Sequence, residues 1–493
     1  MPAARARWRD SWRGGCRNAA ANIFYTLGVD SLKERRLFLV LIDLLFINAA
    51  VVLAFAIWSY RGDKTFVVLL SSQIQWFVLL SAVWLFFAFL SGLYDLRVVV
   101  EFGATSRALI QTFVLVMLVY LAIFFALTDP GLQPVLPRGI VLYHGVLTVV
   151  LIAVWRAAYL QVAPRAPFRR RALIVGAGNA GRTIAQTIRK EFQAHYDVVG
   201  FVDDDLAKQG RRIEGVAVVG KHTDLARLCR ANRVNEVVWA VTRDVSADMF
   251  RALLDVQELG IEVMPMQLLY EQITARVPID YIGDSWYVAL PLGHAGTGSL
   301  YPALKRAFDL VFALVGSFGL ALLLPFIALA MRLDSPGPIF YAQERVGQGG
   351  RIFRVRKIRT MVTDAEQEGK AVWATKNDPR VTRVGALLRK MHLDEMPQFW
   401  NILRGEMSVV GPRPERPEFV AQLEKQIPFY RLRHAVKPGM AGWAILHAGY
   451  VDSVEDARLR VEYDLYYIKH QSIWMDFWIL FRMVGHVLAF RGQ

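Results

Sequence analysis

Four long apolar stretches in the first third of this 493-residue chain constrain its fold more than any other feature. They lie near residues 37–59, 66–93, 108–128 and 140–160. Each approaches or exceeds the roughly 20 residues that a helix needs to cross a bilayer. Hydrophobic residues make up 54% of the chain, which is too many for an ordinary soluble enzyme. We therefore predict a membrane protein whose residues 1–165 form an N-terminal tail and a four-helix transmembrane bundle.

Basic residues predict the orientation of this bundle. The opposite loops hold only Arg61, Lys64 and Arg138, whereas the remaining basic residues gather at the ends of the bundle and between its second and third stretches. Those residues are Lys33, Arg35, Arg36, Arg97, Arg107, Arg165, Arg169, Arg170 and Arg171. Since positively charged loops stay in the cytoplasm, both ends of the bundle are expected there. The arginine-rich N-terminus lacks the pattern of a signal peptide and is interpreted as a cytoplasmic tail.

Two titratable residues, Asp43 and His144, lie inside or at the edge of the predicted spans. Such residues raise the hypothesis of a functional site within the membrane. Asp43 follows Arg36 by only seven residues, which favours the alternative of an interfacial or paired structural role.

Residues 166–270 alternate strand-like apolar runs with helix-like stretches, which predicts a Rossmann-like parallel α/β domain. The first predicted strand runs directly into Gly176, Gly178 and Gly181, and Asp203 follows the last of these by 22 residues. This spacing is typical of dinucleotide binding, so these four residues are candidates to bind a nucleotide cofactor. The alternative is that the glycines only permit a tight turn and close packing in a domain without a cofactor.

A fifth apolar run, 307–331, follows a predicted linker at 271–304. Lys305 and Arg306 precede this run and Arg332 follows it, which favours keeping both of its ends on the cytoplasmic side. Pro325 can break the helix. We predict a re-entrant membrane helix over 305–333 that enters one leaflet, bends and returns. A fifth span with a proline kink is the alternative.

Residues 334–493 contain amphipathic stretches and predict a cytosolic domain that lies against the membrane. Asp394 and Glu395 are adjacent here, and Arg413 stands between two prolines. Two neighbouring carboxylates repel each other unless a cation offsets their charge, so the pair indicates a metal ion and an anionic substrate. Pro397 predicts that Asp394 lies near a helix N-terminus, where backbone N–H groups favour phosphate.

Charge and cysteine content exclude other classes of protein. The net charge is +15, but the arginines lie close to apolar runs and no helix interleaves basic with aromatic residues. This pattern suits anionic lipid and phosphorylated substrates better than nucleic acid. Cys16 and Cys229 are too few and too far apart for a disulfide framework or a zinc site.

With these features in view, the whole chain resembles the large form of the bacterial monotopic phosphoglycosyl transferases, which are undecaprenyl-phosphate hexose-1-phosphate transferases of exopolysaccharide, capsule and O-antigen synthesis. The motifs that carry the resemblance are KRAFD at 305–309, DSPGPIFYAQERVG at 334–347, KIRTM at 357–361, DPRVTRVGALLRK at 378–390, LDEMPQFWNIL at 393–403 and VVGPRP at 409–414. It implies an α-helical transmembrane bundle, a Rossmann-like α/β domain and a membrane-associated α/β catalytic domain with a re-entrant helix. One departure is Leu324, because the family often has serine before the helix-breaking proline.

The resemblance also implies a reaction at the bacterial inner membrane, with the catalytic domain on the cytoplasmic face. Asp394 would be the nucleophile that takes a hexose 1-phosphate from a UDP-hexose, such as UDP-glucose or UDP-galactose, and passes it to undecaprenyl phosphate, with release of UMP. Glu395 would hold Mg²⁺, and Arg413 would clamp phosphate. Weaker phosphate-binding candidates, for which a surface or headgroup contact is the alternative, are Arg380, Arg383, Lys357 and Arg359. The bilayer is a further partner, and a homodimer is left open.

Two rival hypotheses remain. The first is an NAD-dependent membrane-bound nucleotide-sugar dehydratase or epimerase that uses the Gly176 loop. Tyr301 and Lys305 have the spacing of the catalytic pair of short-chain oxidoreductases, although Pro302 disfavours a catalytic helix there. The second is a non-catalytic scaffold for polysaccharide export. Neither rival explains the residues around Asp394.

Overall fold

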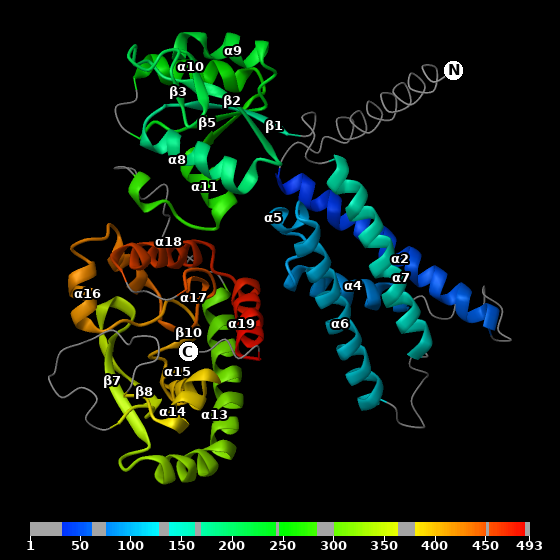
Figure 1. Ribbon diagram of the computed structural model, residues 1–493, viewed down its shortest axis with the longest axis vertical. Helices are drawn as coiled ribbons and strands as arrows, with labels where there is room; N and C mark the ends of the chain where they lie inside the picture. The colour runs from blue at the N-terminus through cyan, green and yellow to red at the C-terminus, as the bar shows by residue number, and fades with distance from the viewer. Residues whose placement is uncertain are drawn as a thin grey trace. The chain divides into compact units, whose positions relative to one another are not determined.

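The computed structural model describes residues 32–61, 75–127, 138–162, 169–242, 246–282, 300–362, 380–449 and 453–488. The chain divides into two compact units, of which the second contains residues 240–245 and everything from Pro265 onward (Figure 1). The predicted N-terminal tail and residues 283–299 of the predicted linker lie outside the described residues.

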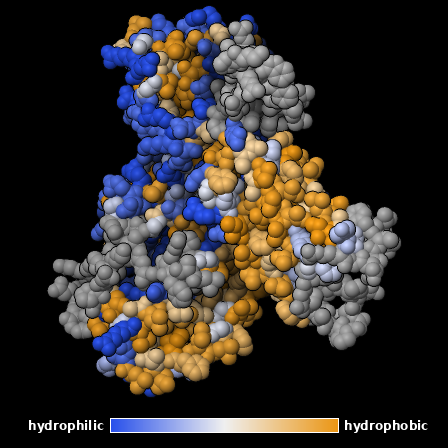
Figure 2. All heavy atoms as spheres, turned by 45° about the vertical axis from the view of Figure 1, so that its right-hand side comes forward, coloured by the Kyte–Doolittle hydropathy of each residue, from blue (hydrophilic) through white to orange (hydrophobic). Residues whose placement is uncertain are grey.

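The first unit begins with apolar helices. Their bounds are α2 (Leu32–Arg61), α4 (Gln75–Leu90), α5 (Leu96–Val99), α6 (Phe102–Leu127) and α7 (Arg138–Val162). Within α2, α6 and α7 the segments Glu34–Tyr60, Phe102–Ile123 and Gly139–Gln161 are long and apolar enough to cross a membrane. The described part of the predicted second span is a shorter apolar helix, Phe77–Leu90. The prediction of several apolar helices of membrane-spanning length is thus confirmed, and Figure 2 shows extensive apolar surface over this region.

Asp43 and His144 lie in the interior of this helical region. Asp43 is fully buried and pairs with Arg156 of α7, with 2.6 Å between Oδ2 and Nη2. His144 is also fully buried and meets Trp84 edge to face. The pairing favours a structural role for Asp43, with Arg156 as its partner, because a buried charge is tolerated only when another charge compensates it.

A mostly parallel sheet completes the first unit and confirms the Rossmann-like prediction. Its strand order is β3-β4-β2-β1-β5-β6, in which β1 pairs in parallel with both β2 and β5. Residues 172–175 of β1 are fully buried, as expected for a strand covered on both faces. The strands are β1 (Arg170–Val175), β2 (Tyr196–Val202), β3 (Arg212–Ile213), β4 (Val216–Gly220), β5 (Glu236–Trp239) and β6 (Glu262–Pro265). The helical segments are α8 (Asn179–Thr187), η2 (Ile188–Phe192), η3 (His222–Asp224), α9 (Leu225–Ala231) and α10 (Ala247–Glu258).

The second unit surrounds a separate core that includes the fully buried Ile402, Val461, Leu465 and Ile479. It contains an antiparallel hairpin, β7 (Phe340–Val346) with β8 (Ile352–Ile358), and a short parallel pair, β9 (Ser408–Val410) with β10 (Gly439–Ala441). Its helical segments are α11 (Met266–Thr274), η4 (Ile279–Tyr281), α13 (Tyr301–Asp334), η5 (Gln348–Gly350), α14 (Arg383–Lys390), η6 (Leu393–Glu395), α15 (Gln398–Arg404), α16 (Pro417–Leu423), η7 (Tyr430–Ala435), α17 (Trp443–His447), α18 (Val454–His470) and α19 (Ile473–Leu488).

The main part of this unit starts at Pro265, before the predicted domain boundary at residues 270/271. That predicted boundary falls inside α11. Glu271 of α11 binds Lys469 of α18, with 2.9 Å between Oε1 and Nζ. Val277 donates its backbone N–H to the carbonyl oxygen of Glu462. These contacts attach α11 to the second unit.

The long helix α13 changes direction in its last third (Figure 1). Pro325 is the proline inside this helix, and a proline there removes one backbone hydrogen bond and displaces the carbonyl one turn earlier. Large apolar side chains cover the outside of α13 and remain exposed, including Val315, Phe318 and Phe326. An apolar helix exposed in this way requires a nonpolar environment or a partner.

Polar side chains near the start of α13 fasten it to the rest of the second unit. Arg306 donates to the carbonyl oxygens of Ile402 and Leu403 at the end of α15, at 2.7 and 2.8 Å. The buried Asp309 accepts hydrogen bonds from the hydroxyl of Ser408 and the backbone N–H of Val409 in β9, at 2.8 and 2.9 Å. Since α15 and β9 flank the segments that carry the predicted site residues, these contacts fix the site relative to α13.

Candidate active site

Asp394 and Glu395 lie in η6, immediately before α15. His392 precedes this turn in the left-handed region, with φ 54°, and Pro397 is the N-cap of α15. Asp394 was predicted near a helix N-terminus, and the structure places it in a separate short turn just ahead of that helix. The turn exposes Asp394 and Glu395 to different surroundings, although they are adjacent in sequence.

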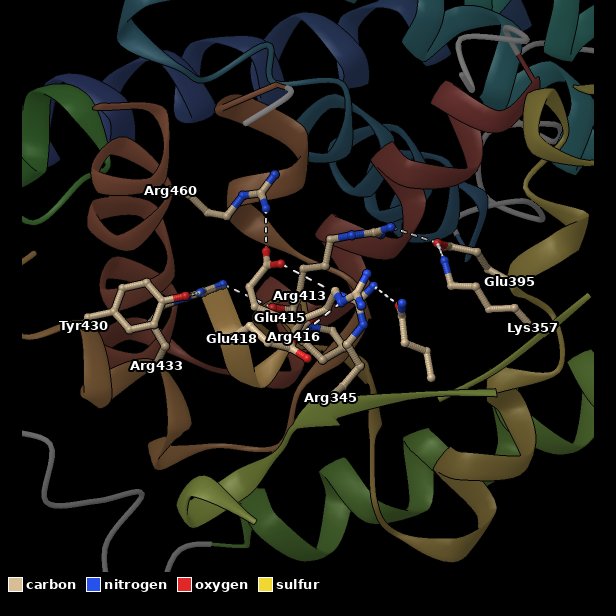
Figure 3. Close-up of polar contacts among 12 residues, drawn as sticks. Arg345, Lys357, Glu395, Arg413, Glu415, Arg416, Glu418, Tyr430, Arg433 and Arg460 are labelled. Atoms are coloured by element: carbon tan, nitrogen blue, oxygen red, sulfur yellow. Dashed lines mark hydrogen bonds and ion pairs between the residues drawn. The ribbon is translucent and has the colours of Figure 1, made fainter. Parts of the chain in front are cut away.

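Glu395 is held by two cations that come from other elements. Its Oε1 lies 2.7 Å from Nζ of Lys357 in β8 and 2.9 Å from Nη2 of Arg413, which follows β9 (Figure 3). Burial raises the pKa of the Glu395 carboxyl, but Arg413 and Lys357 outweigh that effect and bring the pKa well below its usual range. Glu395 is therefore ionised at any physiological pH, and it orients the guanidinium of Arg413.

Asp394 has the opposite electrostatic environment. Its side chain is buried, and burial raises the pKa of its carboxyl. Lys357 lowers this pKa and Glu395 raises it, with a net upward shift. Opposite shifts in two adjacent carboxyl groups are typical of catalytic pairs. A poorly solvated carboxylate is also a better nucleophile, because less water must be removed before it attacks.

The other predicted phosphate-binding residues are Arg359, Arg380 and Arg383. The buried Arg359 donates to the carbonyl oxygen of Pro338 and to the hydroxyl and carbonyl oxygens of Ser335, at 2.7 to 3.1 Å. These bonds tie the end of α13 to the end of β8. Arg383 is exposed at the first residue of α14, and the carbonyl oxygen of Arg380 accepts the backbone N–H of Val362. The structure thus places Lys357 and Arg413 beside Glu395, whereas Arg359 binds Ser335 and Pro338.

A network of charged residues that the sequence did not reveal supports Arg413 from behind. Arg433 is almost fully buried and donates to Asp464 Oδ2 at 2.7 Å and to the backbone carbonyl of Arg413 at 3.1 Å. Glu415 accepts from Arg460 at 2.8 Å. Burial raises the pKa of Glu415, and the surrounding arginines, led by Arg460, bring it below its usual range. The loop that carries Arg413 is therefore supported by the buried pair Arg433–Asp464 and the partly buried pair Arg460–Glu415 (Figure 3).

A small, shallow hollow opens beside Glu395. Arg345, Lys357 and Arg413 line it together with Glu395 and Gln398. Three cations against one carboxylate leave an excess of positive charge, which suits a phosphorylated ligand. Lys357 and Arg413 are among the predicted site residues, whereas Arg345 is not, although it lies in the motif at 334–347 that carries the family resemblance.

The described residues could hold Mg²⁺ only together with the phosphates of a substrate. In the part of the chain that the structure describes, no group of three or more histidine, cysteine, aspartate or glutamate side chains could hold a metal ion. Mg²⁺ is often bound by one or two carboxylates together with substrate phosphates and water. Glu395 and Asp394 supply such a minimal set, so a metal here would depend on the phosphates of a substrate.

The glycine-rich loop of the first unit has structural reasons for its sequence. Gly176 has a φ of 101°, and a methyl group at Gly181 would lie 1.9 Å from the carbonyl oxygen of Gly176. Asp203 accepts hydrogen bonds from the backbone of Ala177 at 2.8 Å and from Lys208 at 3.0 Å. The carboxylate of Asp203, a candidate to bind a nucleotide, thus stabilises the loop itself. Gly178 is the N-cap of α8 and has open space beside it, and a nucleotide bound at this loop stays a prediction.

Tyr301 and Lys305, the residues behind the dehydratase hypothesis, contact one buried carboxylate in the second unit. The hydroxyl of Tyr301 donates to Asp476 Oδ2 at 3.1 Å, and Lys305 Nζ lies 3.0 Å from the same oxygen. Both residues therefore fasten α13 to α19.

Comparison with known proteins decides the family. The family model described as bacterial sugar transferase matches residues 300–490, and a CoA-binding domain model matches residues 89–264. The exopolysaccharide production protein PSS of Rhizobium leguminosarum bv. phaseoli is 44% identical over 195 residues, which cover 38% of this chain and 97% of that protein. This chain belongs to the bacterial sugar transferase family. All the site residues described around Asp394 fall within the matched segment of this sugar transferase.

Longer alignments relate further members to this sugar transferase. A UDP-N-acetylgalactosamine-undecaprenyl-phosphate N-acetylgalactosaminephosphotransferase of Aeromonas hydrophila is 39% identical over 246 residues, 50% of this chain and 57% of that protein. An undecaprenyl-phosphate glucose phosphotransferase of Komagataeibacter xylinus is 33% identical over 335 residues, 66% of this chain and 60% of that protein. The alignments thus span less than two thirds of the length of these two relatives.

Proposed function

We propose that this chain transfers a sugar 1-phosphate from a UDP-sugar to undecaprenyl phosphate and releases UMP, as the first membrane step of exopolysaccharide, capsule or O-antigen synthesis. The observation that carries the proposal is a buried Asp394 beside a Glu395 that Lys357 and Arg413 hold ionised. The printed names of the relatives from Aeromonas and Komagataeibacter describe transfers to undecaprenyl phosphate and support the same reaction class. They name different sugars, so the donor sugar is a question for experiment.

In the proposed mechanism, a carboxylate oxygen of Asp394 attacks the phosphorus next to the sugar. The bond from that phosphorus to the oxygen it shares with UMP breaks, and UMP leaves with the electron pair. The product is an acyl phosphate that joins Asp394 to the sugar phosphate. The phosphate oxygen of undecaprenyl phosphate then attacks the same phosphorus and restores the carboxylate. Covalent catalysis of this kind divides one difficult displacement into two easier ones.

Positive charge near Asp394 would stabilise the charge that develops on the phosphates. Arg413 is placed by its neighbouring prolines and by Glu395, and a guanidinium offers two parallel donors to a phosphate. Lys357 adds a second cation from β8. Glu395 would hold Mg²⁺ together with the substrate phosphates, and the ion would neutralise the diphosphate when bound.

We further propose that α13 is a re-entrant membrane helix and that the catalytic unit works on the cytoplasmic face of the bacterial inner membrane. The exposed apolar surface of α13, the change of direction and Pro325 support this arrangement. The acceptor carries its phosphate at headgroup height on a long lipid tail. The contacts of Arg306 and Asp309 would hold the reacting residues at a fixed distance from the embedded part of α13.

The test uses purified chain in lipid nanodiscs with Mg²⁺, undecaprenyl phosphate and UDP-glucose, UDP-galactose or their N-acetylhexosamine counterparts. Release of UMP should require one of these donors, and intact-protein mass without acceptor should increase by the sugar phosphate. Asp394→Asn should lose both signals, because an amide cannot form the acyl phosphate. The control Glu344→Gln alters an exposed carboxylate of β7 and should retain both. Undiminished turnover by Asp394→Asn would refute the mechanism.

A further inference from the structure

Arg389 is a basic residue next to the candidate nucleophile that the mechanism described above does not use. It lies in the last turn of α14, five residues before Asp394. Its backbone carbonyl oxygen accepts the N–H of His392 at 3.0 Å, so the chain turns back after α14. Leu388 of α14 and Leu393 of η6 belong to one apolar cluster. The turn that carries Asp394 therefore packs against the end of α14.

Close packing fixes the position of α14. A methyl group at Gly385 would lie 2.2 Å from the carbonyl oxygen of Thr360, so the helix touches the backbone that follows β8. The backbone N–H of Val384 donates to Asp334 Oδ2 at 2.9 Å, which ties the first turn of α14 to the end of α13 (Figure 1). Arg389 donates from Nε to the hydroxyl of Thr360 at 2.8 Å. Both the helix and the guanidinium are thus anchored at Thr360.

The two terminal nitrogens of Arg389 are available to a ligand. Arg389 is partly exposed, and within the part of the chain that the structure describes neither Nη1 nor Nη2 has an acceptor or a carboxylate partner. Arg359 is different, because its Nε, Nη1 and Nη2 all donate to Pro338 or Ser335. A guanidinium anchored only through Nε presents two donors in a fixed plane, which suits two oxygens of one phosphate.

The charge of Arg389 acts on Asp394. Burial raises the pKa of the Asp394 carboxyl, and Arg389 is one of the cations that oppose this shift. No direct ion pair joins these two described side chains, so the carboxylate does not occupy the guanidinium. A phosphoryl group bonded to Asp394 would therefore lie within reach of the two free donors.

We infer that Arg389 contacts the phosphoryl group while it is bonded to Asp394 and stabilises its nonbridging oxygens in both half-reactions. The inference rests on the proposed function. In phosphoryl transfer, negative charge is spread over the equatorial oxygens, and catalysis depends on cations placed against them. Lys357 and Arg413 both pair with Glu395, which adds a negative charge beside the nucleophile. Arg389 supplies a further cation from α14 that no carboxylate compensates.

Kinetics in lipid nanodiscs test this assignment with a matched control. For a ping-pong enzyme, kcat/KM for each substrate reports only its own half-reaction. Arg389→Gln should lower kcat/KM for the UDP-sugar and for undecaprenyl phosphate about 10²-fold each, because an oriented donor is lost. Arg389→Lys keeps the charge without the planar fork and should recover only part of the loss. The control Lys390→Gln removes the exposed positive charge of the next residue and should leave both values unchanged.

The anchor at Thr360 gives a second, independent test. Thr360→Val removes the hydroxyl and should lower both values about tenfold, the effect of one hydrogen bond to a charged group. In the Arg389→Gln background the same change should have no further effect, because no guanidinium is left to position. Losses that multiply in the double variant would contradict a role for Thr360 through Arg389.

Unchanged kcat/KM values in Arg389→Gln would overturn the inference. So would a loss confined to one substrate, because the transferred phosphoryl group takes part in both half-reactions. Added guanidinium ion should restore part of the turnover of Arg389→Ala, and the unfolding midpoint of that variant should match that of Lys390→Gln. A lower midpoint without any restoration would assign Arg389 a structural role instead.

Binding of inorganic phosphate separates this inference from the proposed function. Arg389→Gln should bind labelled phosphate about tenfold more weakly than wild-type protein, whereas Lys390→Gln should match wild type. This result would hold even if wild-type protein released no UMP from any UDP-sugar, which would count against the proposed function alone. Equal phosphate affinity of wild type and Arg389→Gln would refute the contact whether or not turnover occurs.

Discussion

Gly316→Ala should disturb the active site through its contact with α15. A methyl group at Gly316 of α13 would lie 2.2, 2.4 and 2.5 Å from three ring atoms of Phe399. Ordinary contact starts at 3.4 Å, so the ring and the methyl must separate by more than 1 Å. Phe399 is the second residue of α15, and Asp394 lies only five residues before it. Displacement of α15 should therefore move the nucleophile.

Two opposing effects set the size of the change. Alanine should favour the helix by about 1 kcal/mol relative to glycine, whereas overpacking typically costs about 1–3 kcal/mol. The net loss of stability should thus be about 0–2 kcal/mol. Misplacement of reacting groups by about 1 Å can cost on the order of 10²-fold in rate. Turnover should consequently fall far more than the unfolding temperature.

Gly319→Ala is the matched control, because the nearest atom to its added methyl is Met396 Cε at 3.8 Å. It gains helix propensity without the clash, so it should match or exceed wild type in thermal stability and retain turnover. The assay is kcat for UMP release together with the unfolding midpoint in nanodiscs. Equal kcat values for the two variants would refute the dependence of the site on close packing between α13 and α15. Restoration of activity by Phe399→Leu in the Gly316→Ala background would support it.

Three further outcomes are expected. Arg413→Lys should lower kcat about 10²-fold, because an oriented donor is lost. The control Arg416→Lys changes a side chain that pairs with Glu418 and should not lower kcat. Similar steady-state rates for the two variants would remove Arg413 from the phosphate clamp. Asp309→Ala leaves the backbone N–H of Val409 without its buried acceptor, whereas the hydroxyl of Ser408 keeps the carbonyl oxygen of Val410. The loss should cost about 1–3 kcal/mol, seen as a lower unfolding midpoint, and an unchanged midpoint would contradict the fastening role. Burial raises the pKa of Asp394 and attack needs its ionised form, so kcat/KM for the UDP-sugar should fall as pH drops through that raised pKa. Lys357→Met removes a charge that lowers the same pKa and should move this acid limb to higher pH; a limb at unchanged pH would exclude Asp394 as the titrating group.

The sequence was sufficient for features that local patterns determine. Apolar runs predicted helices of membrane-spanning length, and buried strands that alternate with helices predicted the Rossmann-like domain. Adjacent carboxylates at Asp394 and Glu395 predicted a compensating cation, and the structure supplies Lys357 and Arg413 beside Glu395. Each of these inferences depends on residues close in sequence or on a repeating period.

Contacts between distant segments could not be predicted in the same way. Arg433 and Asp464 come from η7 and α18, and no periodicity indicates that they pair. Lys357 and Arg359 are two residues apart and would share a face if the strand continued. However, β8 ends at Ile358, and Arg359 instead donates its backbone N–H to Ile339 and its side chain to Ser335 and Pro338. The end of a strand thus separates two residues that alternation would place together.

The KRAFD motif shows how one short segment can connect an apolar helix to a charged site. Lys305, Arg306 and Asp309 each bind an element that precedes or follows the segments carrying Glu395 and Arg413. Their partners include backbone groups of α15 and β9. These contacts therefore fix main-chain positions, which do not move when a single side chain changes its rotamer. If α13 is embedded as proposed, its depth in the bilayer then sets the depth of Asp394. Asp394 could then reach a lipid-borne phosphate at only one depth. The chain would therefore need these charged residues at the start of an otherwise apolar helix.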